Sequence, residues 1–364
     1  MNGVVFTLNK LAQYLRQQGH DILFVVPRLP MGNVSADVVS LKSIPFPFYT
    51  EMRVVLPHWR FHKPEFEKIA GFNPELVHVW TPGVLGFFGQ TWARRHGKPV
   101  VVSYETDILR YLSYYGFDRF RPQALKYFVW LCNNCRKTYV PSADTKRFLE
   151  ANGISDVVVF ERGVDSLRFH PGKRSEEVRK AFQLSPHDVM VLYVGRISKE
   201  KSLERLLDSF LRVSRTHIST RLVLAGDGPL RDRLQRKYGS DKIIFTGVKL
   251  GDDLSVLFAS ADIFALPSRS ETLSLVSLEA MASGLPVIAM REGGVQDVVQ
   301  SEQTGLLADS DTEFEMFLLR LLENPLYRSA LAKEGRRQAE SRTWERGFSI
   351  LERDYRELVS SPKE

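Results

Sequence analysis

The stretch VMVLYVGRISKEKSLERLLDSFLRVSRTHISTRLVLAG, residues 189–226, contains a strand, a turn, a helix and a second strand in succession. Its first seven residues form an apolar run that ends in glycine, which is typical of a buried strand. Apolar residues at helical spacing occupy 202–214, and a second apolar run follows at 220–226. This order predicts a parallel βαβ unit in which helices cover the sheet.

The same alternation continues on both sides of this unit. In the second half we expect helices at 229–238 and 274–283, and strands at 242–247, 262–267 and 286–290. In the first half we expect strands at 21–27, 75–80, 99–104, 137–142 and 156–161. The sequence therefore predicts an α/β protein with two Rossmann-like, doubly wound domains, residues 1–165 and 166–342, which face a cleft. An amphipathic helix at 343–359 is expected to pack back on the first domain.

The beginning of the chain departs from this pattern, because it opens on a helix. Helical spacing is followed by Val4, Leu8, Leu11, Ala12 and Leu15, and Gly19 marks the end of the pattern. A doubly wound domain normally starts with a strand, and the glycine turn after that strand holds the ligand. The opening residues MNGVV supply the turn alone, so we expect the first strand to be missing from the sheet.

Composition and charge narrow the class of protein. The 364 residues are 43% apolar and 26% charged, which is typical of globular domains. No apolar run approaches the roughly 18–20 residues of a spanning helix, and the N-terminus lacks the pattern of a signal peptide. We therefore expect a cytoplasmic location, peripheral on the inner membrane face. Residues 1–165 hold 20 Lys and Arg against 14 Asp and Glu, which favours an anionic partner such as a phospholipid surface or nucleic acid.

The two cysteines, Cys132 and Cys135, form a CxxC motif. A zinc or redox site would need a second pair of ligands or a thioredoxin-like context, and the sequence has neither. We expect two helical thiols, at least one of them buried.

A phosphate-binding pattern follows the strand at 189–195. Gly195 ends the strand, and Arg196 and Lys201 surround the start of the next helix. A guanidinium, an ammonium and free helix N–H groups in one place can bind a diphosphate without a metal, although a solvated basic turn would have the same residues. Two further turns at strand ends carry glycine, at Gly226 and at 293–294. Each alone is equally well explained as a tight turn.

Two glutamates stand out in SETLSLVSLEAMASGLPVIA, residues 270–289. Glu279 lies among apolar residues of the expected helix, which is costly unless the carboxyl group has a polar partner. Glu271 precedes the helix and is favourable beside its N-terminal dipole. The pattern leaves two interpretations open: helix capping, or binding of two hydroxylated parts of one ligand, such as a sugar and a ribose.

In this order and spacing, several motifs resemble the retaining GT-B glycosyltransferases of family 4. They are GVDSLRFHP, YVGRISKEKSLERLL, LVLAGDGPLRDRL, FTGV, the 270–289 stretch, REGG and TGLL. The first half adds NPELVHVWTPGVLG and SYETD, which look most like the glycolipid-forming subgroup that transfers sulfoquinovosyl, glucosyl or mannosyl groups. The resemblance implies a hexose transfer, with retention, from a UDP- or GDP-linked sugar to a diacylglycerol-type lipid.

The resemblance also implies roles for individual residues. Arg196 and Lys201 would bind the donor diphosphate, Glu279 the ribose, and Glu271 the hydroxyls of the transferred sugar. The backbone at Leu273, Ser274 and Leu275 would face the donor, and Gly3 would approach its phosphate from the other domain. The resemblance assigns four more residues to donor binding: Gly195 and Gly226 in the glycine turns, and Gly247 and Val248 in FTGV.

Two residues depart from the family pattern. Relatives often carry ETFG where this chain has Glu271, Thr272, Leu273 and Ser274, so the loop beside the sugar is expected to be narrower. Related SYHTD segments carry histidine where this chain has Glu105. A carboxylate beside a diphosphate would be repelled or protonated, so Glu105 is expected to be reoriented or to bind substrate hydroxyls as a catalytic residue.

The resemblance implies a mechanism in which the leaving diphosphate takes the acceptor proton on the same face of the sugar. No metal and no other cofactor is expected, since the one DxD sequence, residues 309–311, lies at an expected helix start. Two segments rich in aromatic and basic residues, 108–130 and 45–63, are candidates for contact with lipid, and their aromatic residues could equally be core. Alternatives are a soluble sugar or sugar-phosphate acceptor, or a catalytically silent nucleotide-sugar-binding subunit. No nucleic-acid module motif occurs.

Overall fold

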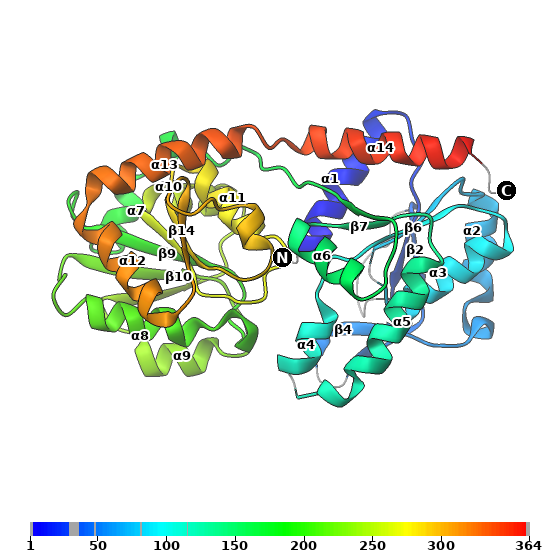
Figure 1. Ribbon diagram of the computed structural model, residues 1–364, viewed down its shortest axis with the longest axis horizontal. Helices are drawn as coiled ribbons and strands as arrows, with labels where there is room; N and C mark the ends of the chain where they lie inside the picture. Colours follow the sequence, from blue (N-terminus) through cyan, green and yellow to red (C-terminus); the bar gives the residue numbers. More distant parts are fainter. Residues whose placement is uncertain (1–2, 29–35, 47–48, 81, 115, 362–364) are drawn as a thin grey trace.

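The computed structural model describes residues 3–28, 36–46, 49–80, 82–114 and 116–361. It has two lobes that meet at a central junction (Figure 1). The N-terminal lobe is built on strands β1 to β8 and the C-terminal lobe on strands β9 to β14. Both lobes are α/β, as the sequence predicts.

The C-terminal lobe contains one six-stranded parallel sheet. Its order is β11-β10-β9-β12-β13-β14, so the chain starts in the middle, at β9, and winds outward in both directions. Most of its strand residues are fully buried, because helices cover both faces. The strands are β9 (Val189–Val194), β10 (Thr220–Ala225), β11 (Ile243–Gly247), β12 (Ile263–Leu266), β13 (Val287–Met290) and β14 (Gly305–Ala308).

The helices expected at 202–214, 229–238 and 274–283 are found as α8, α9 and α11 within a few residues, and the other helices of this lobe were not individually expected. Helix α8 has Leu203, Leu206, Leu207 and Phe210 on its buried face. The helices are α7 (Glu176–Ala181), α8 (Leu203–Val213), α9 (Arg231–Tyr238), α10 (Gly251–Ser260), α11 (Leu275–Ala282), α12 (Asp311–Glu323) and α13 (Pro325–Glu340).

The N-terminal lobe has its strands divided among three sheets. Strands β5, β6, β7 and β8 form a parallel sheet in that order, β1 and β2 form a separate parallel pair, and β3 and β4 form an antiparallel hairpin. The strands are β1 (Phe24–Pro27), β2 (Val38–Leu41), β3 (Ser43–Phe46), β4 (Tyr49–Val55), β5 (Val77–Val79), β6 (Val100–Ser103), β7 (Thr138–Val140) and β8 (Val157–Val159). The described strands of this lobe therefore do not form one continuous sheet.

Helices surround these strands. The first, α1, begins at the junction of the two lobes (Figure 1). The helices are α1 (Gly3–Gln17), α2 (Lys63–Phe72), α3 (Val84–Arg95), α4 (Ile108–Tyr114), α5 (Arg121–Asn133) and α6 (Ala143–Ala151).

The last helix, α14 (Trp344–Ser360), returns from the C-terminal lobe and lies over the N-terminal lobe beside α1 (Figure 1). Its Trp344 and Phe348 pack against Phe6 and Tyr14 of α1. Buried polar contacts add to this packing, since Tyr139 donates to Asp354 at 2.9 Å and Lys137 lies 3.0 Å from the same carboxylate.

Three smaller expectations can be compared with this fold. Cys132 is buried near the end of α5 and Cys135 is half-buried just after it. Neither is in a disulfide, and burial raises the pKa of Cys132 to about 12. Residues 309–311 do lie at a helix start, where Ser310 caps α12 by accepting from the Glu313 N–H.

Strands β2, β3, β4 and β14 were not expected from the sequence. Among the described residues, no helix is long and apolar enough to span a membrane.

Candidate functional site

A cavity of about 3150 Å³ lies between the lobes and extends into the N-terminal lobe. Residues predicted as donor-binding or catalytic line it from both sides. Those that line it are Gly3, Glu105, Gly195, Arg196, Lys201, Gly226, Val248, Glu271, Leu273, Ser274, Leu275 and Glu279. Gly247, also predicted, is outside this lining and supports it by accepting a hydrogen bond from the Gly226 N–H at 2.9 Å.

The cationic part of the site follows strand β9. The turn after β9 is fixed in part by Tyr193, whose hydroxyl donates to the Arg196 carbonyl at 2.8 Å. The turn after β10 packs against the turn after β9, since a Cβ at Gly226 would lie 1.8 Å from the Gly195 carbonyl oxygen. Only glycine permits this approach, so the spacing of the two turns depends on it.

Lys201 and Glu271 are an ion pair at the centre of the site. Lys201 Nζ donates to Glu271 Oε1 at 2.7 Å, and the two side chains are 18% and 12% exposed. Burial alone would lower the pKa of Lys201, but Glu271 and Tyr193 reverse that effect and the pKa is raised. Lys201 is therefore a fixed ammonium group beside a carboxylate, which suits an anionic, hydroxylated ligand.

The loop that carries Glu271 leads into helix α11. The Gly294 N–H donates to the Glu271 carbonyl at 2.7 Å, and a Cβ at Gly294 would lie 2.0 Å from the Thr272 carbonyl oxygen. Ser274, the residue before α11, has φ 87° and ψ 70°. The loop therefore keeps the left-handed backbone that favours glycine, although the residue is serine.

Helices from both lobes begin at this place. A Cβ at Gly3, the first residue of α1, would lie 3.9 Å from Leu275 Cδ1 at the start of α11. The N-terminal ends of helices attract anions through their free N–H groups and their dipole. Gly3 and Leu275, at the two helix starts, line one cavity together with Arg196 and Lys201.

Glu279 is half-buried on α11 and lines the same cavity. Burial raises the pKa of Glu279 to about 8, and the nearby Arg168 opposes that rise. A partly buried carboxyl group that faces a cavity can accept hydrogen bonds from the hydroxyl groups of a ligand.

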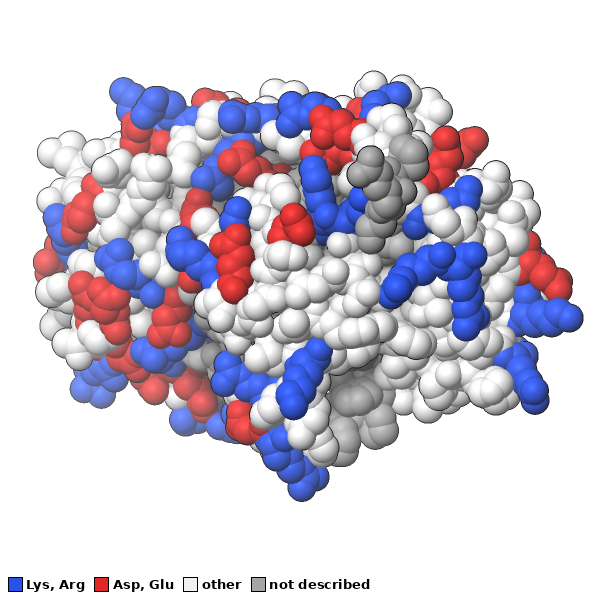
Figure 2. Space-filling model, turned by 45° about the vertical axis from the view of Figure 1, so that its right-hand side comes forward, with Lys and Arg blue, Asp and Glu red and all other residues white. Residues whose placement is uncertain are grey.

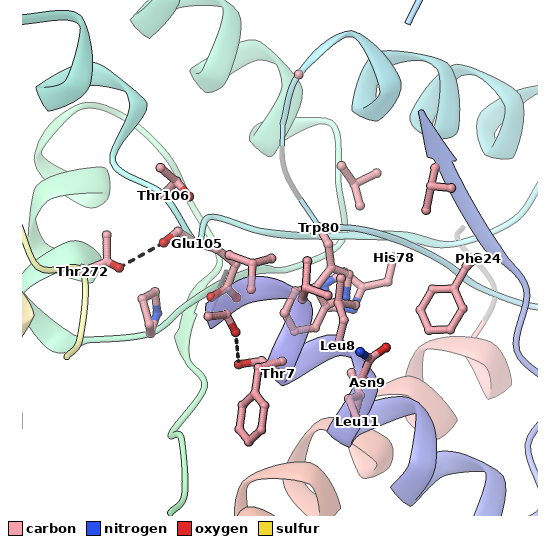
Figure 3. Close-up of a pocket in the computed structure, with 18 of the residues that line it drawn as sticks. Thr7, Leu8, Asn9, Leu11, Phe24, His78, Trp80, Glu105, Thr106 and Thr272 are labelled. Carbon is pink, nitrogen blue, oxygen red and sulfur yellow. Dashed lines mark hydrogen bonds between the residues drawn. The ribbon is translucent and has the colours of Figure 1, made fainter. Parts of the chain in front are cut away.

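Glu105 faces the cavity from the N-terminal lobe but carries its own counter-ion. The buried Arg162 donates to the Glu105 carboxylate, and its guanidinium lies 3.9 Å from the centre of the Phe160 ring. Thr272 Oγ1 donates to the Glu105 backbone carbonyl at 3.0 Å, which links the two lobes (Figure 3). The positive charge of Arg162 offsets the negative charge of the Glu105 carboxylate. The repulsion that we expected between Glu105 and a bound diphosphate would therefore be reduced.

Among the lining residues that were not predicted from the sequence are Arg162, Arg168 and Thr272, which contact or lie near predicted ones. Arg162 follows strand β8, so its position at a strand end was a usable signal. Thr272 lies inside the 270–289 stretch, but an uncharged side chain gave no reason to select it.

The two segments proposed for lipid contact divide between core and surface. In 108–130, Phe128 and Leu109 are buried, whereas Phe120 and Trp130 are 46% and 43% exposed, near the exposed Arg119, Arg121 and Lys126. In 45–63, His62 is buried and Trp59 packs on Phe66 and Phe88, while Phe61 is 47% exposed. Residues 47–48 and 115 lie outside the described residues, as do the side chains of 46, 49–52, 110–111 and 114.

The charged residues visible on the N-terminal lobe are mainly Lys and Arg. Figure 2 shows Lys and Arg with few acidic neighbours over this lobe, whereas the two signs mix over the C-terminal lobe.

Comparison with known proteins identifies the family. Residues 1–168 match the family model described as Glycosyltransferase Family 4, and residues 174–338 match Glycosyl transferases group 1. A GDP-mannose-dependent alpha-mannosyltransferase of Mycobacterium tuberculosis is 35% identical over 353 residues, which are 94% of this chain and 90% of that protein. The chain is a GT-B glycosyltransferase of family 4.

This glycosyltransferase is similar to proteins named for glycolipid synthesis. The sulfoquinovosyl transferase of Arabidopsis thaliana is 34% identical over 343 residues, covering 91% of this chain and 66% of the plant protein. The alpha-monoglucosyldiacylglycerol synthase of Streptococcus pneumoniae is 27% identical over 320 residues, covering 84% of this chain and 72% of that protein.

Solved structures confirm the GT-B fold of this glycosyltransferase. Sucrose-phosphate synthase from Thermosynechococcus elongatus has a TM-score of 0.79 at 21% identity and covers 97% of this chain and 92% of its own. Anabaena HepE, in complex with UDP and glucose, has a TM-score of 0.76 at 18% identity, and the match covers 97% of this chain and 95% of HepE.

Proposed function

We propose that this glycosyltransferase moves a hexose from a UDP- or GDP-linked sugar to a diacylglycerol-type lipid, with retention of the anomeric configuration. The Lys201–Glu271 ion pair, which lines the cavity together with Arg196, is the observation that carries the proposal. Charged groups of both signs at one point suit a ligand in which a diphosphate adjoins sugar hydroxyls. The names of the relatives favour a glycolipid product.

In donor binding, the cationic groups and the carboxylates of the site would contact different parts of the nucleotide sugar. Arg196, Lys201 and the first turns of α1 and α11 would bind the diphosphate. Glu271 would accept hydrogen bonds from the transferred sugar, and Glu279 from the ribose. The buried pair Glu105–Arg162 would position the loop at 105–107, which Thr272 contacts through its hydroxyl.

The proposed mechanism follows from the partners of the two predicted catalytic carboxylates, Glu271 and Glu105. Glu271 pairs with Lys201, and Glu105 pairs with Arg162. A carboxylate held by a cation is a weak nucleophile, so the leaving diphosphate is the better base for the acceptor proton. The C–O bond to the diphosphate breaks as the acceptor oxygen approaches the same face of an oxocarbenium-like sugar. Arg196 and Lys201 stabilise the charge that develops on the leaving group, without a metal ion.

The acceptor would enter from a membrane surface on which the enzyme lies peripherally, at the inner face. The basic N-terminal lobe and the exposed aromatic residues Phe120 and Trp130 support this placement.

The test is a panel of UDP- and GDP-sugars, with release of nucleoside diphosphate measured in the presence and absence of vesicles that contain diacylglycerol. We expect release to depend on vesicles, to persist in EDTA, and to give an α-linked lipid from an α-linked donor, read by NMR. Equal turnover with a soluble sugar and no vesicles would favour a soluble acceptor. No release with any donor would indicate a silent binding subunit.

A further inference from the structure

One wall of the cavity is apolar where helices α3, α4 and α5 of the N-terminal lobe come together. Helix α4 contacts α5, and the Tyr127 hydroxyl of α5 donates to the carbonyl of Gly83, the residue before α3, at 2.9 Å. The side chains that line the cavity here are half-buried or exposed. We name them the alkyl groove: Val84, Phe87, Leu112, Phe117 and Tyr127.

Two polar groups of this wall satisfy each other. The Gly83 carbonyl accepts from the Tyr127 hydroxyl and also from the Phe87 N–H, at 3.0 Å. Burial raises the pKa of Tyr127 to about 12, so the hydroxyl keeps its proton for this bond. A peptide in the groove would bring backbone N–H and C=O groups that need partners, whereas a hydrocarbon needs none. The wall therefore suits a hydrocarbon chain.

The inner end of the alkyl groove is polar and adjoins the donor site. Residues 105–107, on the loop after β6, line the same cavity. Thr272 of the other lobe donates to the Glu105 carbonyl at 3.0 Å (Figure 3). On the groove side, the ring of Tyr104 packs edge-on against that of Phe128 in α5, with 5.9 Å between their centres. A ligand that extends from this loop along the groove would have its polar atoms near the donor and its carbon atoms beside α5.

The outer end of the groove leads to an exposed aromatic patch. Trp130 is 43% exposed, and the centre of its ring lies 5.9 Å from that of Phe87 and 6.2 Å from that of Tyr127. Phe120 is 46% exposed, and its ring centre lies 6.4 Å from that of Phe117. Each exposed ring thus adjoins a ring that lines the cavity. The apolar surface is therefore continuous from the cavity to the outside, which is typical of a binding site for an apolar ligand.

Basic side chains accompany this patch. Arg119, Arg121 and Lys126 are exposed, and the Arg119 guanidinium lies 4.7 Å from the centre of the Phe120 ring. A membrane surface presents anionic headgroups and, beneath them, alkyl chains. Cations outside, aromatic rings next and an apolar groove within have the order in which a lipid that leaves such a surface would meet them.

We propose that the alkyl groove binds one alkyl chain of the lipid acceptor during sugar transfer, with the acceptor hydroxyl at the 105–107 loop. Such binding rests on the proposed transfer to a lipid, and it adds that part of the acceptor leaves the membrane and lies inside the protein. Each CH2 group that enters the groove contributes to affinity. The enzyme therefore selects its acceptor by the length of the alkyl chain as well as by the hydroxyl group.

Photo-labelling tests the site without sugar transfer. The probe is 1-O-decylglycerol with a diazirine in the middle of its alkyl chain, added below its aggregation concentration, without vesicles or donor. We expect label on peptides of α3 and α5 that excess unmodified 1-O-decylglycerol removes. Leu112→Gln, which places an amide in the groove, should reduce labelling at least fivefold. Ile44→Gln is the matched control, because Ile44 is 54% exposed on β3 and outside the cavity lining.

Acceptor kinetics test the dependence on chain length. The soluble acceptors 1-O-hexylglycerol and 1-O-octylglycerol are compared with a donor that supports transfer. Two more CH2 groups in the groove should lower KM about tenfold in the parent protein and in Ile44→Gln, but less than threefold in Leu112→Gln, with little change in kcat. Val84→Phe, which fills the groove with a ring, should match Leu112→Gln in both experiments, so the result does not depend on the folding of one variant.

Three results would overturn the proposal. The first is labelling that both groove variants leave unchanged. The second is label confined to residues 117–121, which would mean that the alkyl chain stays outside the protein. The third is sugar transfer to both acceptors with equal KM in the parent protein, which would leave the proposed function intact. Displaceable label on α3 and α5 with no transfer to any acceptor would support the groove as a lipid site and contradict the proposed function instead.

Discussion

At the scale of single residues, Ser274 has the backbone conformation of glycine with the side chain of serine. Its φ is 87°, and its hydroxyl lies 2.7 Å from that of Ser277. We predict that Ser274→Gly is more stable than Ser274→Ala by about 1 kcal/mol, because both lose the hydroxyl and glycine alone is unstrained at positive φ. Urea unfolding measures the difference. Equal stability of the two variants would contradict the assigned backbone.

Glu279 gives a pH-dependent prediction. Its folded pKa of about 8 exceeds the ordinary value of 4.5, so its contribution to stability is full below pH 4.5 and is lost as the pH rises through 8. Glu279→Gln is uncharged at every pH. Its free energy of unfolding relative to that of the parent protein should therefore increase by on the order of 3 kcal/mol between pH 5 and pH 9.

Urea unfolding at the two pH values measures this gain, with the exposed Glu177→Gln as control. A gain that is the same at both pH values would disprove the raised pKa. The same substitution should weaken donor binding, since Glu279 is proposed to bind the ribose.

At the scale of elements, helix α14 joins the C-terminal chain end to the N-terminal lobe. We predict that Asp354→Ala destabilises the protein by about 1–3 kcal/mol, because the substitution leaves the hydroxyl of Tyr139, which is 1% exposed, without its acceptor. Ser349→Ala, at an exposed position of the same helix, should change the free energy of unfolding little. Equal effects of the two substitutions would show that the buried contacts of α14 are not stabilising.

The elements also show how far sequence reasoning extends. Apolar runs predicted strands β5 to β13, and helical spacing predicted helices α1, α8, α9, α11 and α14, because period is a local signal. The hairpin of β3 and β4 was missed, since Pro45 and the aromatic residues around it suggested a surface segment. Arg196 and Lys201 were selected by their place after a strand, and the donor-binding roles of the site residues came from the family resemblance and stay predictions. The Arg162 partner of Glu105 lies 57 positions away in sequence and depends on tertiary structure.

At the scale of the whole molecule, the basic lobe predicts binding to anionic membranes. Vesicles with anionic lipid should bind the enzyme more tightly than neutral vesicles, and increasing salt should weaken that binding. Lys126→Glu and Arg121→Glu should each reduce binding about fivefold or more, at about 1 kcal/mol per basic residue near the surface.

Cosedimentation with vesicles measures this binding, and Lys180→Glu, exposed on α7 of the other lobe, is the matched control. If the control substitution weakens binding as much as the other two, the N-terminal lobe is not the membrane-facing side.

The central claim is that the turn after β9 stabilises the leaving diphosphate. Its most direct test compares kcat for sugar transfer in Arg196→Ala and Lys199→Ala, because the two residues share one turn and Lys199 is exposed and outside the cavity lining. The account predicts that Arg196→Ala lowers kcat by about 100-fold or more, whereas Lys199→Ala leaves it within about twofold. Equal kcat values for Arg196→Ala and the parent enzyme would contradict the account.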